Sequence, residues 1–293
     1  MSTAAATPPL RVATWNVRNG VAFDGLDSWP FRRRATAETL AALQADVACL
    51  QEVYGFQQRF LLRRLPEYAA AGAGRTDGRR GERCAVLWRS ARLRLDEART
   101  RWFSDAPDRP GSTGWGNRQP RVVTLARFTD RASGRAFGVA DCHLEGSPAS
   151  SRHRSAHALL AWLDPALPWV VAGDLNAEPG DEAIATLLDG GLRDVFALAG
   201  SDRRPARRPD GAEARFGPVE AGPRRGLGDC PPTTLPPHGR PGRRIDYLLV
   251  SAGWEVGAAA VAAAGHRRRP SDHLPVVATL RLTDQTGSEA THA

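Results

Sequence analysis

The chain has 293 residues, of which 42% are hydrophobic and 25% charged, and this composition excludes general disorder and indicates a globular protein with a large core. Its formal charge of +8 comes from 40 basic residues that are all arginine, so compositional bias could produce it, and it favours a nucleic-acid partner only weakly. Residues 1–9 lack a basic start followed by an apolar stretch, and no run is long enough to span a bilayer, so we expect a cytoplasmic monomer without a transmembrane segment.

The cysteines show no metal-binding or disulfide pattern. They have no CxxC spacing, and the first three lie in apolar, strand-like runs where a thiol packs as a small hydrophobic group. The positions are Cys49, Cys84, Cys142 and Cys230. We therefore expect neither a zinc site nor a disulfide framework.

The first half of the chain alternates strand-like and helix-like segments. Residues 11–17 are rich in β-formers and stop at a turn signal, so Asn16 lies near a strand exit. Helical spacing over 31–43 leads to a short apolar strand over 46–52 that ends in an acid, Glu52. A helix over 53–65 and strands over 68–71, 83–88 and 92–103 follow.

The second half places further polar residues where strands stop. Strands are predicted over 121–128 and 136–142, and the latter leads into His143. An apolar strand over 169–172 stops at Gly173, so that Asp174 and Asn176 stand at its carboxyl end. Helices over 150–163 and 181–188 flank this strand.

The last third begins with a Pro-, Gly- and Arg-rich stretch, residues 200–243, which predicts a long surface loop. A strand over 244–251 carries one conspicuous acid, Asp246, and an alanine-rich strand and a last strand ending at Leu282 follow. Helices and hairpins both connect the strands, so we expect one mixed-sheet α/β domain. Its predicted limits are residues 10–282, with a disordered stretch at 1–9 and a frayed tail at 283–293.

Each of these polar positions also has a purely structural interpretation. Gly-Asp-x-Asn is equally compatible with a turn that ends a strand, and a lone His143 on an apolar strand is more typical of a buried, hydrogen-bonded core histidine. Asp246 could pair with Arg243 or Arg244. Yet a carboxylate beside a neutral acceptor at a strand end suits a hard cation or an attacking water, and ligands of α/β proteins bind at such ends.

Six motifs, in this order, resemble those of the endonuclease/exonuclease/phosphatase superfamily, and the resemblance runs from about Arg11 to Leu282. The motifs are Thr14-Trp15-Asn16, Gln51-Glu52, His143-Leu144, Gly173-Asp174-x-Asn176, Arg244-Ile245-Asp246-Tyr247 and Ser271-Asp272-His273. The resemblance implies a four-layer α/β sandwich, in which two mixed β-sheets pack face to face between helices, as in deoxyribonuclease I. The segment 104–127 looks like that of the small bacterial metal-dependent hydrolases of this superfamily.

The resemblance also implies roles for single residues. Glu52 would be the main metal ligand, with Asn16 and Asp272 near the same ion, which would be Mg²⁺ or, as a substitute, Mn²⁺. Asp174 and Asn176 would orient or deprotonate the attacking water and bind a phosphate oxygen.

The remaining implied roles concern the phosphate and its surroundings. His273 would contact the scissile phosphate with support from Asp246, and His143 would be a second catalytic histidine with Glu82 as its carboxylate partner. For Arg121, a contact with substrate phosphate and an exposed place at a strand start stay equally open.

The implied function is Mg²⁺-dependent hydrolysis of a phosphate mono- or diester by in-line attack of an activated water. A small molecule or a lipid headgroup is favoured as substrate, because the loop over 145–151 is short and no basic helix interleaved with aromatic residues is present. A nuclease acting on DNA or RNA is the nearest alternative. A catalytically silent binding protein of the same fold is another, although every polar site position carries a competent side chain.

Overall fold

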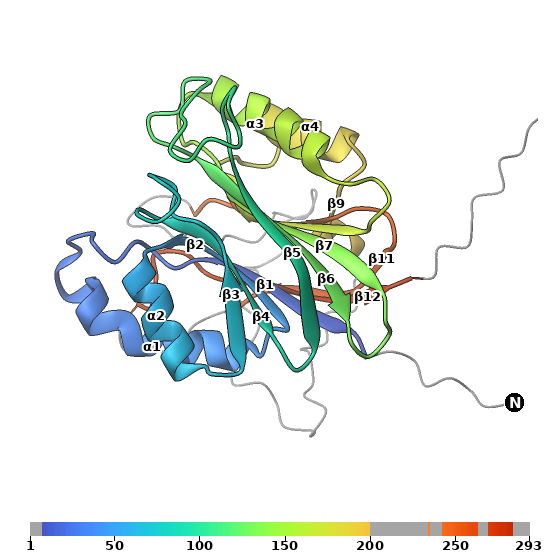
Figure 1. Cartoon of the computed structure of the whole chain (residues 1–293), viewed down its shortest axis with the longest axis horizontal. Helices are drawn as coiled ribbons and strands as arrows, with labels where there is room; N and C mark the ends of the chain where they lie inside the picture. Colours follow the sequence, from blue (N-terminus) through green and yellow to red (C-terminus); the bar gives the residue numbers. More distant parts are fainter. Residues whose placement is uncertain (1–7, 200–233, 235–241, 263–268, 284–293) are drawn as a thin grey trace, which may run out of the picture.

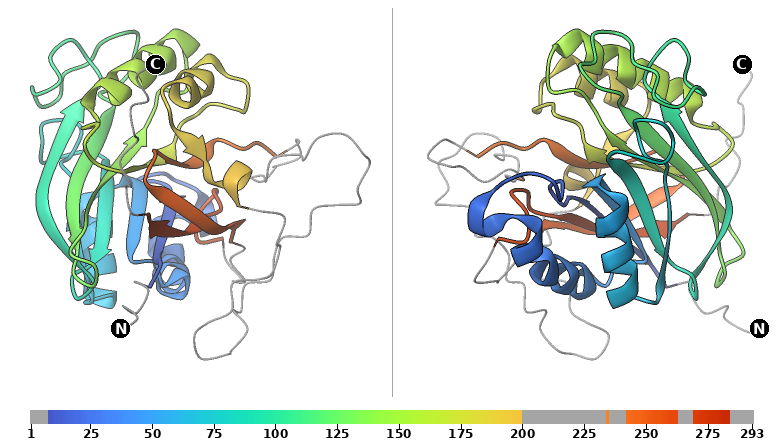
Figure 2. Two further views of the ribbon diagram at one scale, coloured as in Figure 1. Left: turned by 90° about the vertical axis from the view of Figure 1, so that its right-hand side faces the viewer. Right: turned by 60° about the vertical axis from the view of Figure 1, so that its left-hand side comes forward.

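Two six-stranded β-sheets form the centre of the molecule, with a pair of helices outside each (Figure 1). The computed structural model describes residues 8–199, 234, 242–262 and 269–283. Helices α1 (Trp29–Leu43) and α2 (Gly55–Arg64) cover the outer face of the first sheet, and α3 (Ala149–Trp162) and α4 (Glu182–Asp189) cover that of the second (Figure 2). This arrangement confirms the predicted four-layer α/β sandwich.

The first sheet joins the two ends of the described chain. Its strand order is β11-β12-β1-β2-β4-β3, in which β1 and β2 run parallel and the other neighbours are antiparallel. The strands are β1 (Leu10–Asn16), β2 (Val47–Val53), β3 (Tyr68–Ala71), β4 (Arg83–Arg89), β11 (Trp254–Val261) and β12 (Val276–Leu282).

The second sheet is built mainly from the middle of the chain. Its order is β5-β6-β7-β8-β10-β9, and here β7 and β8 are the parallel pair. The strands are β5 (Leu93–Trp102), β6 (Val122–Asp130), β7 (Ala136–His143), β8 (Trp169–Asp174), β9 (Arg193–Asp194) and β10 (Asp246–Val250). Both parallel pairs are connected through a helix, as parallel strands require.

The core has three layers because successive residues of a strand point to opposite faces. Val12 of β1 lies in the cluster between the two sheets, together with Phe128 and Val170 of the second sheet. Its neighbour Ala13 lies in the cluster under α1 and α2. A third cluster, which contains Leu159, fills the space between the second sheet and α3 and α4. Each fully buried side chain of valine or larger contributes about 1.5–3 kcal/mol of hydrophobic free energy.

A buried polar pair joins the two sheets inside this core. The Gln51 amide donates to Asp141 Oδ1 over 2.6 Å and to the Thr14 hydroxyl over 3.0 Å, and all three residues are fully buried. Asp141 Oδ2 and Gln51 Oε1 have no hydrogen-bond partner. Burial raises the pKa of Asp141 to about 8, against the opposing effect of the Gln51 hydrogen bond, so the carboxyl is largely protonated at neutral pH.

The directions of the strands bring the strand ends at or beside which the candidate site residues lie to one edge of the sandwich. The carboxyl ends of β1 and β2, and those of β7 and β8, are adjacent because each pair is parallel. Strands β10 and β12 run antiparallel to β8 and β1, so they begin where those strands finish. Six strand ends therefore meet at a common edge.

The main strands and helices lie where the sequence predicts them, and three short elements were not predicted. These are the 3₁₀ turn η1 (Gly25–Asp27), strand β9 and helix α5 (Val195–Leu198). Cys49, Cys84 and Cys142 are buried with free thiols. No helix among the described residues is long and apolar enough to cross a membrane. The predicted loop over 200–243 and the expectations for 1–9 and 283–293 fall almost entirely outside the described residues.

Candidate active site

Strands β8 and β10 place two acids side by side. Asp174 ends β8, Asp246 begins β10, and they are direct partners in the antiparallel ladder. His143, at the end of β7, is the parallel partner of Asp174 on its other side. The preceding Gly173 has a φ of 151°, and a Cβ there would lie 1.9 Å from the Cys142 carbonyl oxygen, so only glycine permits this approach of β8 to β7.

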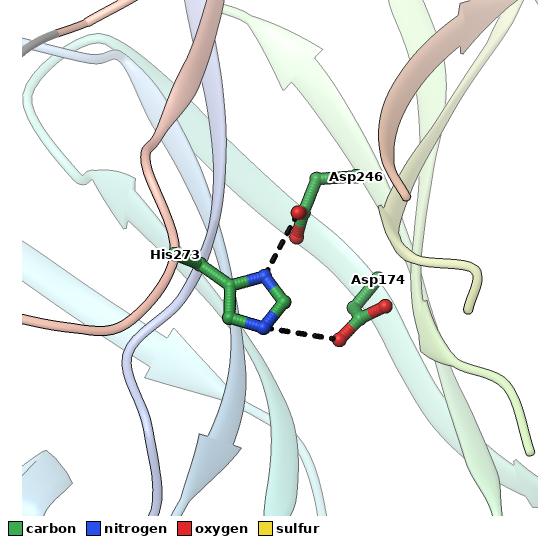
Figure 3. A group of neighbouring side chains, drawn as sticks. All are labelled: Asp174, Asp246 and His273. Atoms are coloured by element: carbon green, nitrogen blue, oxygen red, sulfur yellow. Dashed lines mark hydrogen bonds and ion pairs between the residues drawn. The ribbon is translucent and has the colours of Figure 1, made fainter. Parts of the chain in front are cut away.

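His273 enters the same edge from the loop before β12 and lies between these two acids (Figure 3). Its Nδ1 is 2.8 Å from Asp246 Oδ2, and its Nε2 is 3.8 Å from Asp174 Oδ2. The backbone of this histidine is also fixed, because its N–H donates to the Ser271 hydroxyl and its carbonyl accepts from the Trp15 indole. Only 7% of its surface is exposed.

The charge of His273 follows from these neighbours. Burial alone would lower the pKa of the imidazole, but the negative charge and hydrogen bond of Asp246, with a smaller effect of Asp174, raise it to about 10. The ring is therefore an imidazolium at neutral pH. It presents Nε2–H towards the space beside Asp174, as a donor to an anionic oxygen.

Asn16 links the two sheets within the site. Its amide nitrogen donates to Glu52 Oε1 and to Asp174 Oδ2, each over 3.0 Å, and its amide oxygen accepts from the Arg18 backbone N–H. In this orientation, which follows from the hydrogen bonds, the NH₂ group rather than the oxygen faces the acids. The predicted role of Asn16 as a metal ligand would require the amide to turn over.

Glu52 lies in an irregular part of β2 with φ at 63°, a rare conformation for a residue with a side chain. The Asn19 backbone N–H and side-chain amide both donate to its Oε2, over 2.8 and 3.1 Å. Burial would raise the pKa of Glu52, but His143 and the hydrogen bonds from Asn16 and Asn19 lower it to about 2. The carboxylate is thus ionised and held in place before any ligand arrives.

Asp174 is almost fully buried among hydrogen-bonding and charged neighbours. Its Oδ1 accepts from the backbone N–H of Asn176, whose φ of 49° is also in the left-handed region. Burial raises the pKa of Asp174, an effect that the two imidazoles oppose and that the neighbouring Asp246 carboxylate strengthens. A buried carboxylate with a raised pKa is a better proton acceptor than an exposed one.

His143 differs from His273 in charge. Its Nε2 accepts from the Asn176 amide over 3.1 Å and lies 3.5 Å from Asp174 Oδ2. Burial and the positive charge of Arg121 lower the pKa of His143 to about 4, so the ring is neutral at pH 7. Two histidines at one edge therefore have opposite protonation states.

Next to His143, two arginines are paired with acids. Arg121 lies 3.4 Å from Glu145, and Arg75 lies 2.8 Å from Glu82. Arg121 is buried at the cleft, so the expectation of an exposed strand-start residue is wrong, while contact with substrate phosphate stays a prediction. Glu82 was expected to pair with His143, but in the described structure it forms no hydrogen bond with that neutral ring, because the Arg75 guanidinium supplies a full positive charge.

Asp272 and Asp246 complete the predicted set. Asp272 is partly exposed at the mouth of the site, and its Oδ2 lies 3.7 Å from an Arg18 guanidinium nitrogen. The alternative in which Asp246 pairs with Arg243 or Arg244 is excluded, since these contact Glu178 and Asp194. In the basic run 267–269, which precedes Ser271 in the sequence, the first two residues fall outside the described residues.

The residues present suit a divalent metal ion. Asp174, Asp246 and His273 place one potential ligand atom each within 4.8 Å of one another, and Asp246 Oδ1 is buried without a hydrogen-bond partner. A protonated imidazole cannot bind a metal, however, so His273 serves better as a hydrogen-bond donor. The ionised Glu52 carboxylate and the partly exposed Asp272 both raise the pKa of Arg18 through their negative charge, and they match the one or two carboxylates that Mg²⁺ prefers alongside water and substrate oxygens.

A sandwich with a buried acid–imidazole cluster at its edge is suited to the hydrolysis of phosphate esters. A family model described as the endonuclease/exonuclease/phosphatase family matches residues 13–273, and the chain belongs to this family. Its members depend on a divalent metal ion and hydrolyse phosphate esters.

Individual relatives agree with this assignment. An endonuclease/exonuclease/phosphatase from Bacteroides vulgatus is 25% identical with a TM-score of 0.79, over 94% of this chain and 99% of that one. A mannosyl-6-phosphatase from Bacteroides thetaiotaomicron is also 25% identical, with a TM-score of 0.77 over 93% and 100%. Nocturnin from Rattus norvegicus is 28% identical over 60% of this chain, which covers 45% of that curated relative.

Three residues near the site were not singled out from the sequence. Asn19 holds Glu52, yet in Arg18-Asn19-Gly20 it was interpreted only as part of a turn signal. Arg75 and Glu145 form the ion pairs beside His143 but lie in loops. Only Asn19 had a usable signal, because an asparagine in a turn commonly forms hydrogen bonds through its side-chain amide.

Proposed function

We propose that this protein is a Mg²⁺-dependent phosphoesterase that hydrolyses a phosphate mono- or diester by in-line attack of water. The observation that carries the proposal is His273, a buried imidazolium held by Asp246 with its free nitrogen facing Asp174 (Figure 3). This places a proton donor and a proton acceptor within 3.8 Å of each other. Such an arrangement suits a reaction that needs both at one phosphorus atom.

Each of three site residues has a separate role in the proposed reaction. Asp174 accepts a proton from the attacking water as the new P–O bond forms and the ester P–O bond breaks, and the departing oxygen takes up a proton from solvent. His273 donates to a non-bridging phosphoryl oxygen and stabilises the charge that develops there. Asn176 holds Asp174 through its backbone N–H and contacts His143 through its amide.

Glu52 would hold the metal ion, with Asp272 nearby. A Mg²⁺ ion bound there supplies positive charge that screens the phosphate from the attacking oxygen. The expectation rests on the hydrogen bonds that keep Glu52 ionised, and Mn²⁺, which favours the same oxygen ligands, would substitute.

A small molecule or a lipid headgroup is the favoured substrate. The likeness to a mannosyl-6-phosphatase supports a small phosphate ester. The loop after β1 carries Val21 and Phe23, exposed by 62% and 95%, and these would contact the apolar part of a lipid substrate.

A substrate panel tests the proposal. The protein is incubated with sugar phosphates, generic phosphodiesters, lipid phosphodiesters in vesicles, plasmid DNA and single-stranded DNA or RNA, with Mg²⁺ and with a chelator. We expect chelator-sensitive turnover of small or lipid esters above that of nucleic acid. Plasmid nicking that exceeds small-ester turnover would instead establish the nuclease, and neither turnover nor calorimetric Mg²⁺ binding would identify a silent binding protein.

A further inference from the structure

Outside the active site, the outer helical layer carries a pair of histidines that the proposed reaction does not use. His153 and His157 are one turn apart on α3, so their side chains lie on the same face of the helix. Their Nε2 atoms are 3.0 Å apart. They border an open hollow of about 480 Å³ between α3 and α4, lined also by Glu182, Thr186 and Asp189.

The separation of the two nitrogens fits neighbouring positions on one metal ion. With metal–nitrogen bonds of about 2.0–2.1 Å, two ligands are about 2.8–3.0 Å apart in octahedral geometry and about 3.3–3.4 Å apart in tetrahedral geometry. The observed 3.0 Å therefore needs little side-chain movement. Without a metal, one ring must be protonated at Nε2 to donate to the other, whereas a metal ion would engage both lone pairs.

A carboxylate from the neighbouring helix supports this arrangement. Oε1 of Glu182, the first residue of α4, lies 3.4 Å from His153 Nδ1. A carboxylate at that nitrogen favours the tautomer that carries the proton on Nδ1 and leaves Nε2 free. Metal-binding histidines commonly have such a partner at their other nitrogen, where it orients the ring.

From these contacts we propose that His153 and His157 form a surface site for a borderline transition-metal ion such as Zn²⁺, with Glu182 as the group that orients His153. Water molecules complete the coordination in the open hollow. Imidazole ligands select Zn²⁺, Ni²⁺ or Cu²⁺ over Mg²⁺, so this site and the carboxylate-rich active site take different ions.

The test is a calorimetric titration of chelator-treated, tag-free protein with Zn²⁺ in the presence of excess Mg²⁺. Wild-type protein is expected to bind one more equivalent of Zn²⁺ than His157→Ala, and to show a Zn²⁺-dependent rise in Tm that this variant lacks. Glu182→Gln is expected to weaken the same binding event about tenfold. Thr186→Ala is the matched control, because this residue lines the same hollow without an imidazole or a carboxylate, and it is expected to keep the wild-type isotherm.

Two further results decide the interpretation. Circular dichroism and phosphoester turnover with Mg²⁺ should be unchanged in His157→Ala, because the side chain is exposed and lies outside the catalytic cluster. Identical Zn²⁺ isotherms for wild type and His157→Ala would overturn the proposal, whether or not the protein proves to be a phosphoesterase.

Discussion

Replacing Asp246 with asparagine removes one negative charge from behind His273 with almost no change in shape. Asp246 is fully buried, and its Oδ2 is the partner of His273 Nδ1 at 2.8 Å. An asparagine oxygen can still accept the Nδ1–H hydrogen bond, so the ring keeps its orientation. The variant therefore separates the charge of the pair from its geometry.

The effect on His273 can be worked out from its environment. Burial lowers the pKa of this imidazole, and Asp246 is the main influence that brings it up to about 10. Without that charge the pKa falls to its ordinary value near 6.5 or below. An imidazole with a pKa of 6.5 is only about one-tenth protonated at pH 7.5, so a rate that needs the imidazolium drops at least about tenfold.

The assay is the pH dependence of kcat/KM on a chromogenic phosphodiester between pH 5.5 and 9, with fixed-time samples quenched before reading. We expect the wild-type rate to stay high up to pH 9, because His273 remains an imidazolium. The rate of Asp246→Asn should fall as the pH rises above about 6.5. His273→Ala is the control, and it should have a low rate at every pH, without the fall above pH 6.5. A rate of Asp246→Asn that did not fall between pH 6.5 and 9 would refute the assigned role of the pair.

Three other changes have defined outcomes. Asp174→Asn should lower turnover by on the order of 10²-fold or more with a nearly unchanged Tm; wild-type turnover in this variant would contradict its role as proton acceptor. Glu52→Ala should raise the Mg²⁺ concentration needed for half-maximal rate, measured by titrating the metal at saturating substrate. Asp141→Asn should stabilise the protein in denaturant melts at pH 9 but not at pH 4. The reason is that the folded-state pKa of Asp141, about 8, lies above its ordinary value, so the wild-type protein loses stability as the pH rises from that ordinary value to about 8. Equal stability of wild type and Asp141→Asn at pH 9 would contradict this reasoning.

Several positions that meet at the candidate site could be recognised from the sequence because they interrupt a simple pattern. Asp174 follows an apolar run that ends at a glycine, and Asp246 is a lone acid among apolar residues. Buried strands tolerate such residues only at their ends or with partners, so these positions predict where strands stop. The structure places them together because β10 runs antiparallel to β8, so that the first residue of β10 lies beside the last residue of β8.

The details that could not be predicted depend on contacts between distant parts of the chain. The pairing of Glu82 with Arg75 is decided by two loops whose relative position no local pattern specifies. The direction of the Asn16 amide depends on which acids surround it, and those come from both sheets. The two-residue strand β9 is too short to show a period, and only its ladder with β10 defines it.

The proposed catalytic groups are shared between the sheets, and this has a consequence for folding. Asn16 and Glu52 come from strands of the first sheet and His273 from the loop that leads into its strand β12, while Asp174 and Asp246 come from the second sheet. Neither half of the sandwich carries a complete set. We therefore expect that no fragment confined to one sheet can turn over substrate, and that recovery of activity during refolding reports the docking of the two sheets rather than the formation of either.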